Sequence, residues 1–562
     1  MWELTRIKSI AKDHTKRIDH RRGLFITNII GKIFERLIKE RNQEEGNMLT
    51  MSPFQCGGVK GRSTVDNVFT LIAIIQRNQY LGLSTYCVFI DLTKCFDKLW
   101  LEDCLVELMK AGMNIDDVKM VYEMNKVAKV VVDTPVGDTD QFEVRDTVKQ
   151  GTIFGPVMCG LSTGRINGIN ERVVTMYGPE VEIEPLVYVD DMNNGGDKPN
   201  SEKFLRNCRS FELQKKATIN IDKSGYVIVN ESPNDQPLET TMQHGQIKRK
   251  PEMRDLGCWI DESGTYDVNI NKTNEQTEML IKKVKEMASE TKVGKYSTIL
   301  KLELYEKVIC PSLHYNVQAW HKISDNAIQK LEKRQGSILK RLLHIPSSTT
   351  TRGVLYETGI WPVKEKIVYK KIMLLHNILQ SDDKRIIKKI VLTQDKYQMP
   401  GSWLTNLKEE ARKYEINVHV ECIMGKSKAT LKKEVKSTIE GYIEKQMKEK
   451  HTPKMRSVIM GTFGRKSYLE GELTKEEVTK ALKIKLHMVQ AQANYGQKNL
   501  CEFCMLVEET TEHILLNCQK LQQFYERQMP NDVITTDVGQ LKKLIRVSDR
   551  IFKIKTKTFY EE

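Results

Sequence analysis

Short apolar runs alternate with helical patterns over the first 260 residues of the chain. Residues 86–91 (YCVFID), 186–191 (LVYVDD) and 225–230 (GYVIVN) each predict a buried strand. Residues 23–40 predict an amphipathic helix, because apolar side chains recur there at helical spacing. These are Leu24, Ile30, Ile33, Phe34, Leu37 and Ile38. The segment after the second strand, MNNGGDKPN, predicts a turn. The pattern indicates one α+β domain.

The pattern changes near residue 269, where long stretches rich in Lys, Glu and Leu begin. They predict a mostly helical section to about residue 400. Residues 426–456 carry a surplus of basic side chains, which fits either a solvated helix face or a surface that follows phosphates. Thr474 and Glu477 predict a capping box at the start of a further helix.

Composition narrows the class of partner. The 562 residues (65.0 kDa) include 88 Lys and Arg against 74 Asp and Glu, a net charge of +14. Such a surplus favours a polyanion, either nucleic acid or an anionic membrane surface. Only 12 cysteines are present, which indicates a reducing, intracellular setting in the cytoplasm or nucleus. The start of the sequence has no signal-peptide pattern, and its apolar runs are shorter than the roughly 20 residues of a membrane-spanning helix.

Three carboxylates follow two of the predicted strands. Asp91 ends the first strand, and Asp190 and Asp191 end the second. Carboxylates gathered on neighbouring buried strands repel one another unless cations neutralise them, and Mg²⁺ prefers such oxygen ligands. Two Mg²⁺ ions held this way catalyse phosphoryl transfer. A simpler interpretation is that two adjacent aspartates open a turn.

The blocks around these acids resemble those of reverse transcriptases, specifically the non-LTR (LINE-like) retrotransposon lineage. FIDLTKCFD, KQGTIFGPVMCGL, LVYVDDM, NIDKSGYVIVN and RDLGCWID follow in family order, preceded by RRGLFITNII and FQCGGVKGRST. Later segments, LKLELYEKVICPSLHYNVQAW and STTTRGVLYETGIWPV, resemble the thumb and the region after it. The sequence departs from the family pattern at Gly58 and Val59, where Phe and Arg are usual, and at Phe154 and Gly155 before Pro156.

The resemblance implies a role for each matching residue. Asp91, Asp190 and Asp191 would hold two Mg²⁺, and Lys223 would protonate the leaving pyrophosphate. Phe96 would exclude a ribose 2′-OH, although it also fits an ordinary core position. The remaining substrate contacts would be made by Gln150 and Gly151 on the nucleotide and template side, and by Arg22, Lys60 and Arg62 on phosphates. The partners implied are an RNA template, a DNA primer or target DNA, and dNTPs.

The same resemblance implies a right-hand polymerase of the α+β class with a small zinc module near its end. We expect fingers and palm with an antiparallel sheet over residues 1–265, a helical thumb and connection over 266–400, and a basic helical region over 401–495. The zinc module would span 496–525 and a C-terminal tail 526–562. Elements of this lineage carry an endonuclease, and we expect none within these residues.

Four metal-binding side chains lie close together near the end of the chain. Cys501, Cys504, His513 and Cys518 have the spacing of a closed tetrahedral Zn²⁺ site with three thiolates and one imidazole. Because all four ligands hold the metal, the site would be structural and would support nucleic-acid binding.

Two functions from different classes fit the sequence. The first is an RNA-directed DNA polymerase that uses two Mg²⁺ and carries one Zn²⁺. The second is a non-catalytic nucleic-acid-binding relic of a truncated element. The presence of all three acids favours the enzyme. A maturase-like splicing helper would share the palm, but the terminal Cys/His cluster argues against it.

Overall fold

The structure is a computed structural model that describes residues 4–11, 21–44, 51–134, 137–146, 148–215, 217–290, 296–449, 463–489 and 500–558. The chain forms two compact units. The N-terminal unit consists of Met1–Val268, Ala319–Lys322 and Asn377–Leu407, and the C-terminal unit contains the remaining residues. The five-part division predicted from the sequence stays a prediction. Among the described helices, none combines the length and apolarity needed to cross a bilayer.

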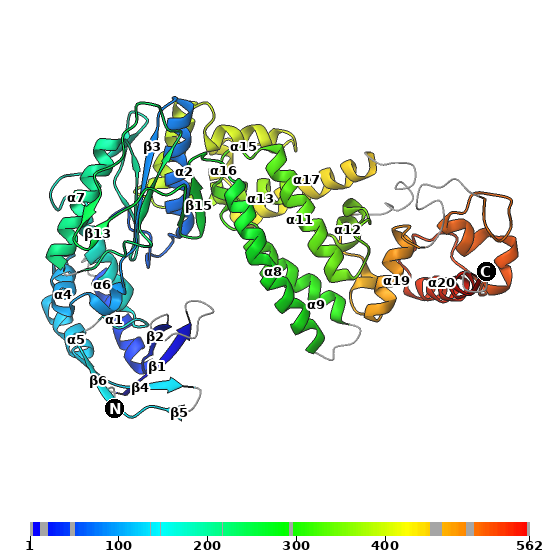
Figure 1. The fold of residues 1–562 in the computed structure, drawn as a ribbon, viewed down its shortest axis with the longest axis horizontal. Coiled ribbons are helices and arrows are strands. Elements are labelled where there is room, and N and C mark those ends of the chain that lie inside the picture. The colour runs from blue at the N-terminus through cyan, green and yellow to red at the C-terminus, as the bar shows by residue number, and fades with distance from the viewer. Residues whose placement is uncertain are drawn as a thin grey trace. The chain divides into compact units, whose positions relative to one another are not determined.

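The central sheet of the N-terminal unit is antiparallel and has the strand order β11-β3-β10-β9. Its strand β3 is labelled in Figure 1. Its strands are β3 (Thr85–Ile90), β9 (Leu186–Tyr188), β10 (Asp191–Gly196) and β11 (Gly225–Val229). All six residues of β3 are buried, as expected for a central strand. The expected turn after residue 191 is wrong, because residues 191–196 form β10 and pair with β3.

Side-chain contacts explain why the Asn- and Gly-rich segment forms a strand. Asn194 Nδ2 donates to Ser201 Oγ of α7 (Lys198–Lys215), so this polar side chain is satisfied inside the core. The adjacent Gly195 lies against α2 (Thr64–Tyr80), where an added Cβ would lie 2.6 Å from Leu71 Cδ1. Since successive residues of a strand face opposite sides, α7 and α2 cover opposite faces of the sheet.

A second sheet is formed by strands that lie before and after the first helix in the sequence. Its order is β2-β1-β4-β5, with β6 also paired to β4, and β1 runs parallel to β4. The strands are β1 (Leu4–Ala11), β2 (Arg21–Ile26), β4 (Val127–Thr134), β5 (Gly137–Asp138) and β6 (Phe142–Arg145).

The first helix differs from its prediction in both its start and its orientation. Residues 21–26 form β2, and α1 begins at Ile29 and ends at Glu44. Of the expected apolar stripe, Ile38 is buried, whereas Ile30, Ile33, Phe34 and Leu37 are 38–57% exposed. The buried face is instead polar, because Glu35 Oε2 accepts from Ile153 N and Asn42 Nδ2 donates to Asp117 Oδ2.

Segments that follow residue 376 complete the N-terminal unit. Helix α14 (Ile386–Lys396) packs against α2 and against β8 (Val181–Ile183). The guanidinium of Arg385 bonds both carboxylate oxygens of Asp66, at 2.5 and 2.8 Å, and Asp66 is only 1% exposed. Trp403, at the start of α15 (Trp403–Arg412), lies edge-on to Phe69.

The remaining elements of the N-terminal unit are short. They are α3 (Cys95–Lys98), α4 (Leu101–Lys110), α5 (Ile115–Asn125), α6 (Phe154–Thr163), β7 (Thr175–Tyr177), β12 (Thr241–Met242), β13 (Gly245–Gln246), β14 (Glu252–Asp255) and β15 (Cys258–Asp261).

The C-terminal unit is helical, in agreement with the pattern after residue 269. Its helices include α8 (Asp267–Glu290), α9 (Ser297–Leu304), α10 (Cys310–Leu313), α11 (Asp325–Leu343), α12 (Thr351–Thr358), α13 (Val363–Leu379), α16 (Val420–Met424), α17 (Lys428–Glu449), α19 (Lys475–Lys485) and α20 (Val538–Thr558). The capping box is confirmed, because Thr474 Oγ1 accepts from Glu477 N and Glu477 Oε2 accepts from Thr474 N.

Candidate active site and metal centre

Asp91 directly follows the central strand β3. Its backbone is fixed on both sides, since its N–H donates to Ser224 Oγ and its C=O accepts from Asn220 N. Its side chain is 27% exposed, so the carboxylate is partly accessible to solvent. The end of a buried strand thus presents this acid with little conformational freedom.

Asp190 and Asp191 lie at the tight hairpin that joins β9 to β10. Tyr188 pairs with Asp191 across the hairpin, and Val189 and Asp190 form its two-residue loop. Because β10 is hydrogen-bonded to β3, the loop is brought to the same end of the sheet as Asp91. The structure therefore gathers the three acids that the sequence singled out.

Electrostatic repulsion within this group is strong. Burial, together with the charges of Asp190, Asp255 and Asp91, raises the pKa of Asp191 to about 7, although the charge of Lys223 acts in the opposite direction. A carboxyl with such a pKa lacks sufficient positive charge around it. The donor set is all oxygen and anionic, which fits a hard divalent cation such as Mg²⁺.

Lys223 lies in the turn before β11. Its Nζ is 3.8 Å from Asp91 Oδ2, and its side chain is 62% exposed, so the ammonium can move toward a ligand. The proximity of this lysine to Asp91 was not evident from the sequence.

Asp255 is an acid of this site that sequence reasoning missed. It ends β14, is 6% exposed and accepts from Asn193 Nδ2 of β10 at 2.9 Å. Burial raises its pKa to about 7. It lies within the RDLGCWID block, so its position could be noticed, but a single acid before a two-residue turn gives no distinct signal.

A cavity of about 740 Å³ opens beside these groups. It is lined by the end of β3, by the start of β10, by the turn before β11 and by the β14–β15 hairpin. Its charged lining residues are Asp91, Asp191, Asp222, Lys223, Lys250, Glu252, Arg254 and Asp255. Acids at the sheet end and bases on the surrounding turns suit a phosphate ligand held through metal ions.

The predicted nucleotide-side residues have clear structural neighbours. Phe96 lies in α3, partly buried, and packs against the core beneath the sheet. Gln150 accepts through its backbone C=O from Phe25 N of β2. Gly151 has a φ of 121°, and a Cβ there would lie 2.4 Å from Phe25 O, so only glycine fits.

The three predicted phosphate contacts have different surroundings. Lys60 is exposed. Arg62 Nη1 donates to the carbonyls of Ser52, Pro53 and Gln55, so its guanidinium already holds the loop around residues 52–55. Arg22 lies in β2, and its side chain is outside the described part of the structure.

In the C-terminal unit, the four predicted metal ligands come together. The donor atoms of Cys501, Cys504, His513 and Cys518 all lie within 4.8 Å of one another. The Cys504 Sγ to His513 Nε2 distance is 3.3 Å, and the Cys501 Sγ to Cys518 Sγ distance is 3.9 Å. These separations and this donor set fit tetrahedral Zn²⁺.

Local backbone bonds shape the Cys/His cluster. The N–H of Cys501 donates to Val507 O and the N–H of Met505 donates to Cys501 O, which closes the loop around the first cysteine pair. His513 begins a π-helical turn (His513–Asn517) that leads to Cys518. Burial raises the pKa of the Cys501 thiol to about 11, so a bound metal would have to displace its proton.

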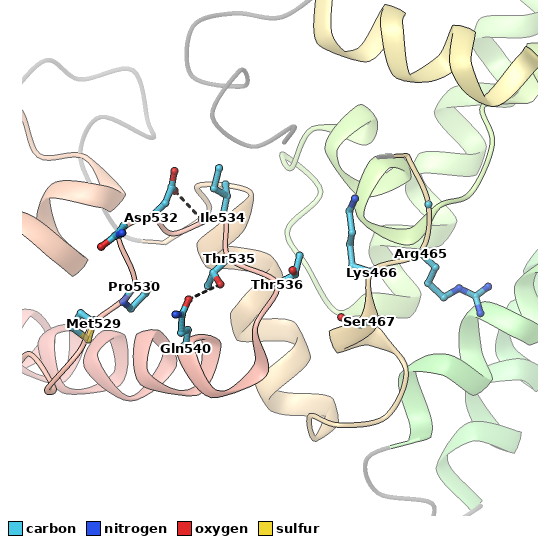
Figure 2. A pocket seen from close by; sticks show the side chains of 12 residues that line it. Arg465, Lys466, Ser467, Met529, Pro530, Asp532, Ile534, Thr535, Thr536 and Gln540 are labelled. Atoms are coloured by element: carbon cyan, nitrogen blue, oxygen red, sulfur yellow. Dashed lines mark hydrogen bonds between the residues drawn. The ribbon is translucent and has the colours of Figure 1, made fainter. Parts of the chain in front are cut away.

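A separate cavity of about 700 Å³ lies in the C-terminal unit between residues 464–467 and 529–540 (Figure 2). In Figure 2, Gln540 bonds Thr535, and Arg465 points away from the cavity centre. Arg465 is paired with Glu303 and Glu306. Among the described residues that line this cavity, none was predicted as a site residue.

Comparison with known proteins gives one family match. The family model of reverse transcriptase (RNA-dependent DNA polymerase) matches residues 10–260. No sequence among curated proteins matches the chain.

Several solved structures are similar to the chain. Apo telomerase from Candida tropicalis truncated from its C-terminal domain shares 13% identity, with 46% of this chain and 53% of that chain covered and a TM-score of 0.32. Telomerase from Candida albicans in complex with a TWJ fragment of telomeric RNA shares 11%, with 77% and 64% covered and a TM-score of 0.34. Apo telomerase from Candida tropicalis shares 11%, with 78% and 69% covered and a TM-score of 0.34. The chain thus spans 53% to 69% of the length of these relatives.

Proposed function

We propose that this protein extends a DNA 3′-OH on an RNA template. Residues 10–260 match the reverse transcriptase family, whose members are RNA-dependent DNA polymerases and thus nucleotidyltransferases. The observation that carries the proposal is the convergence of Asp91, Asp190 and Asp191 at one end of the central sheet, where burial and the charges of the neighbouring acids raise the pKa of Asp191. Such an arrangement is costly to the fold unless it serves to hold cations.

The proposed mechanism assigns one task to each group. Asp91, Asp190 and Asp191 would hold two Mg²⁺, which would supply Lewis-acid activation of the attacking hydroxyl and charge stabilisation of the leaving oxygen. Lys223 is close enough to Asp91 to stand beside the leaving pyrophosphate, and its Nζ would deliver a proton there.

The substrate-side proposals concern the incoming nucleotide and the template. Phe96 would exclude a ribose 2′-OH, and its packing against the core would keep the ring in place. The Gln150–Gly151 turn would line the nucleotide and template side. Lys60 is exposed and free to approach phosphate, whereas the contacts of Arg62 favour support of its own loop.

We further propose that the domain belongs to the non-LTR (LINE-like) retrotransposon lineage. The support is the order of the seven sequence blocks together with the terminal Cys/His cluster, whose donor atoms fit one structural Zn²⁺. In this proposal the RNA template, the primer or target DNA and dNTPs are the partners. The alternative, a non-catalytic nucleic-acid-binding relic, would keep the basic charge and lose catalysis.

Primer extension on an RNA template with Mg²⁺ and dNTPs tests the proposal. The wild type should extend the primer, and Asp190→Asn should abolish extension while leaving RNA affinity unchanged, because the basic surface is untouched. Asp116→Asn is the matched control, since Asp116 is 73% exposed and forms an ion pair with the exposed Lys119. A wild type that binds RNA without extending a primer would favour the relic.

A further inference from the structure

The hairpin loop that carries Asp190 has an unfavourable backbone at Val189. Its φ is 60°, in the left-handed region that a β-branched residue rarely adopts. Left to itself, the loop would relax and move the adjacent carboxylate. Neighbouring contacts must therefore hold this peptide in place.

Gln55, from the loop that precedes α2, makes those contacts. Its side-chain Oε1 accepts from Val189 N at 3.0 Å and from Gly57 N at 2.8 Å. Its Nε2 donates to Gly160 O and to Thr163 Oγ1 of α6, both at 3.3 Å. All these polar groups are thereby satisfied around a side chain that is 0% exposed.

The following peptide unit, which contains the carbonyl of Val189, is held as well. Thr163 Oγ1 donates to Val189 O at 2.6 Å, so the N–H and the C=O of this residue are both fixed. Gly57 closes against the loop so tightly that a Cβ there would lie 2.4 Å from Val189 Cγ2.

The backbone of Gln55 is itself firmly placed. Its N–H donates to Ser52 O, and its C=O accepts from Arg62 Nη1 at 2.7 Å. The adjacent Cys56 N donates to Val187 O, and Val187 N donates to Phe54 O. These two bonds form a single parallel β-bridge between Gln55 and Val187 of β9.

We propose that Gln55 is the positioning residue of the Asp190–Asp191 turn. Its carboxamide, together with Thr163, keeps Val189 left-handed and thereby aims the two carboxylates at the site of Asp91. Gln55 does not touch substrate or metal in this proposal, and it acts only through the turn. The inference rests on the proposed polymerase function for its kinetic readout, but its structural readout is independent of activity.

The test uses Gln55→Met, which keeps the volume and removes every side-chain hydrogen bond. The turnover number should fall by about 100-fold, as expected for misplaced reacting groups, whereas the KM for dNTP stays within about threefold. Amide exchange at Val189, followed by mass spectrometry of the peptide around it, should accelerate. Exchange in β11 should stay unchanged.

Gln394→Met is the matched control. Gln394 is also buried in the N-terminal unit, donates to Tyr177 Oη and accepts from Leu404 N. Its loss should lower the melting temperature without changing the turnover number or Val189 exchange. Val189→Asn should partly rescue Gln55→Met, because asparagine tolerates the left-handed region.

Two results would overturn the proposal. One is unchanged Val189 exchange in Gln55→Met, and the other is a fall in turnover no larger than that of Gln394→Met. If the wild type lacks polymerase activity, the proposed function fails, and the exchange data still decide whether Gln55 holds the turn.

Discussion

At the scale of single residues, Asp191 experiences strong electrostatic repulsion from its neighbours. Its carboxyl is buried beside Asp190, Asp255 and Asp91, and its pKa is raised to about 7 from an ordinary value of 3.8. A raised carboxyl pKa in the folded state means that the unfolded state ionises first as pH rises. This group therefore contributes a stability penalty that is absent at low pH and grows through neutrality.

We predict that Asp191→Asn stabilises the metal-free protein in a pH-dependent way. Well below pH 4 the Asp191 carboxyl is protonated in both the folded and the unfolded wild type, and the variant and the wild type should melt together. Between about pH 4 and 7 the wild type should lose up to about 1.4 kcal/mol of folding free energy per pH unit relative to the variant, with no further divergence above.

Thermal melts in a chelator across this range measure the difference. Added Mg²⁺ should restore the wild type at neutral pH and have little effect on Asp191→Asn. A difference in melting temperature that does not grow with pH would contradict the assignment of the raised pKa to Asp191.

The acids that we propose as metal ligands could be singled out from the sequence because they lie in local blocks. Asp91, Asp190 and Asp191 each end a short apolar run, and the structure brings them together. Asp255, Asn193 and Gln55 could not be assigned, because their roles arise from contacts with residues 62 to 134 positions away. A glutamine two residues before a pair of glycines gives no local pattern that predicts a hydrogen bond to a distant hairpin.

At the scale of elements, two predictions failed for the same physical reason. The Asn- and Gly-rich β10 was expected to be a turn, and α1 was expected to bury its apolar stripe. Local propensity was overridden in both cases by tertiary contacts: the close approach of α2 at Gly195, and the polar bonds of Glu35 and Asn42.

The Cys/His cluster was predicted correctly as a group, but its surroundings were not. Ile514 and Leu521 are buried, and the segments that contain them, residues 513–517 and 519–524, pack against α20. Lys555 of α20 pairs with Glu509, which is fully buried. The cluster is thus integrated with a helix that follows it by about 20 residues, which the spacing of the ligands could not indicate.

We predict that Cys504→Ser releases one equivalent of Zn²⁺ per chain. Loss of one thiolate removes a quarter of the ligand set, so residues 500–518 should unfold locally and α20 should lose protection from amide exchange. Metal analysis and exchange measure both effects. Cys422→Ser is the matched control, because Cys422 is exposed and lies outside the cluster.

The N-terminal unit should be unaffected by this change, since its core is built from other residues. A wild type without bound zinc, or a Cys504→Ser variant that retains it, would refute the metal site.

At the scale of the whole molecule, the N-terminal unit is completed by a segment that lies more than a hundred residues after Val268. This segment is Asn377–Leu407. Within it, Arg385 forms hydrogen bonds with Asp66, and Trp403 packs edge-on against Phe69. Asp66 also caps α2 by accepting from Ser63 N, so the same carboxylate fixes a helix start and a distant segment. The sequence blocks predicted fingers and palm over residues 1–265 and a thumb and connection over 266–400, but they could not indicate the pairing of Arg385 with Asp66, because a contact across 319 positions leaves no trace in a local pattern.

We predict that Arg385→Met destabilises the N-terminal unit by about 3–5 kcal/mol, because it leaves the carboxylate of Asp66 buried and unpaired. Urea unfolding followed in that unit should show the loss, while the C-terminal unit melts as before.

Lys396→Met is the matched control. Lys396 lies in α14 and forms an ion pair with Glu180. Both partners are more than half exposed, so the loss of this pair should change the stability little. Adding Asp66→Asn should recover part of the loss, since the asparagine keeps an acceptor for Ser63 without a buried charge. If Arg385→Met were as stable as Lys396→Met, the contact of Arg385 with Asp66 would not be needed for the stability of the N-terminal unit.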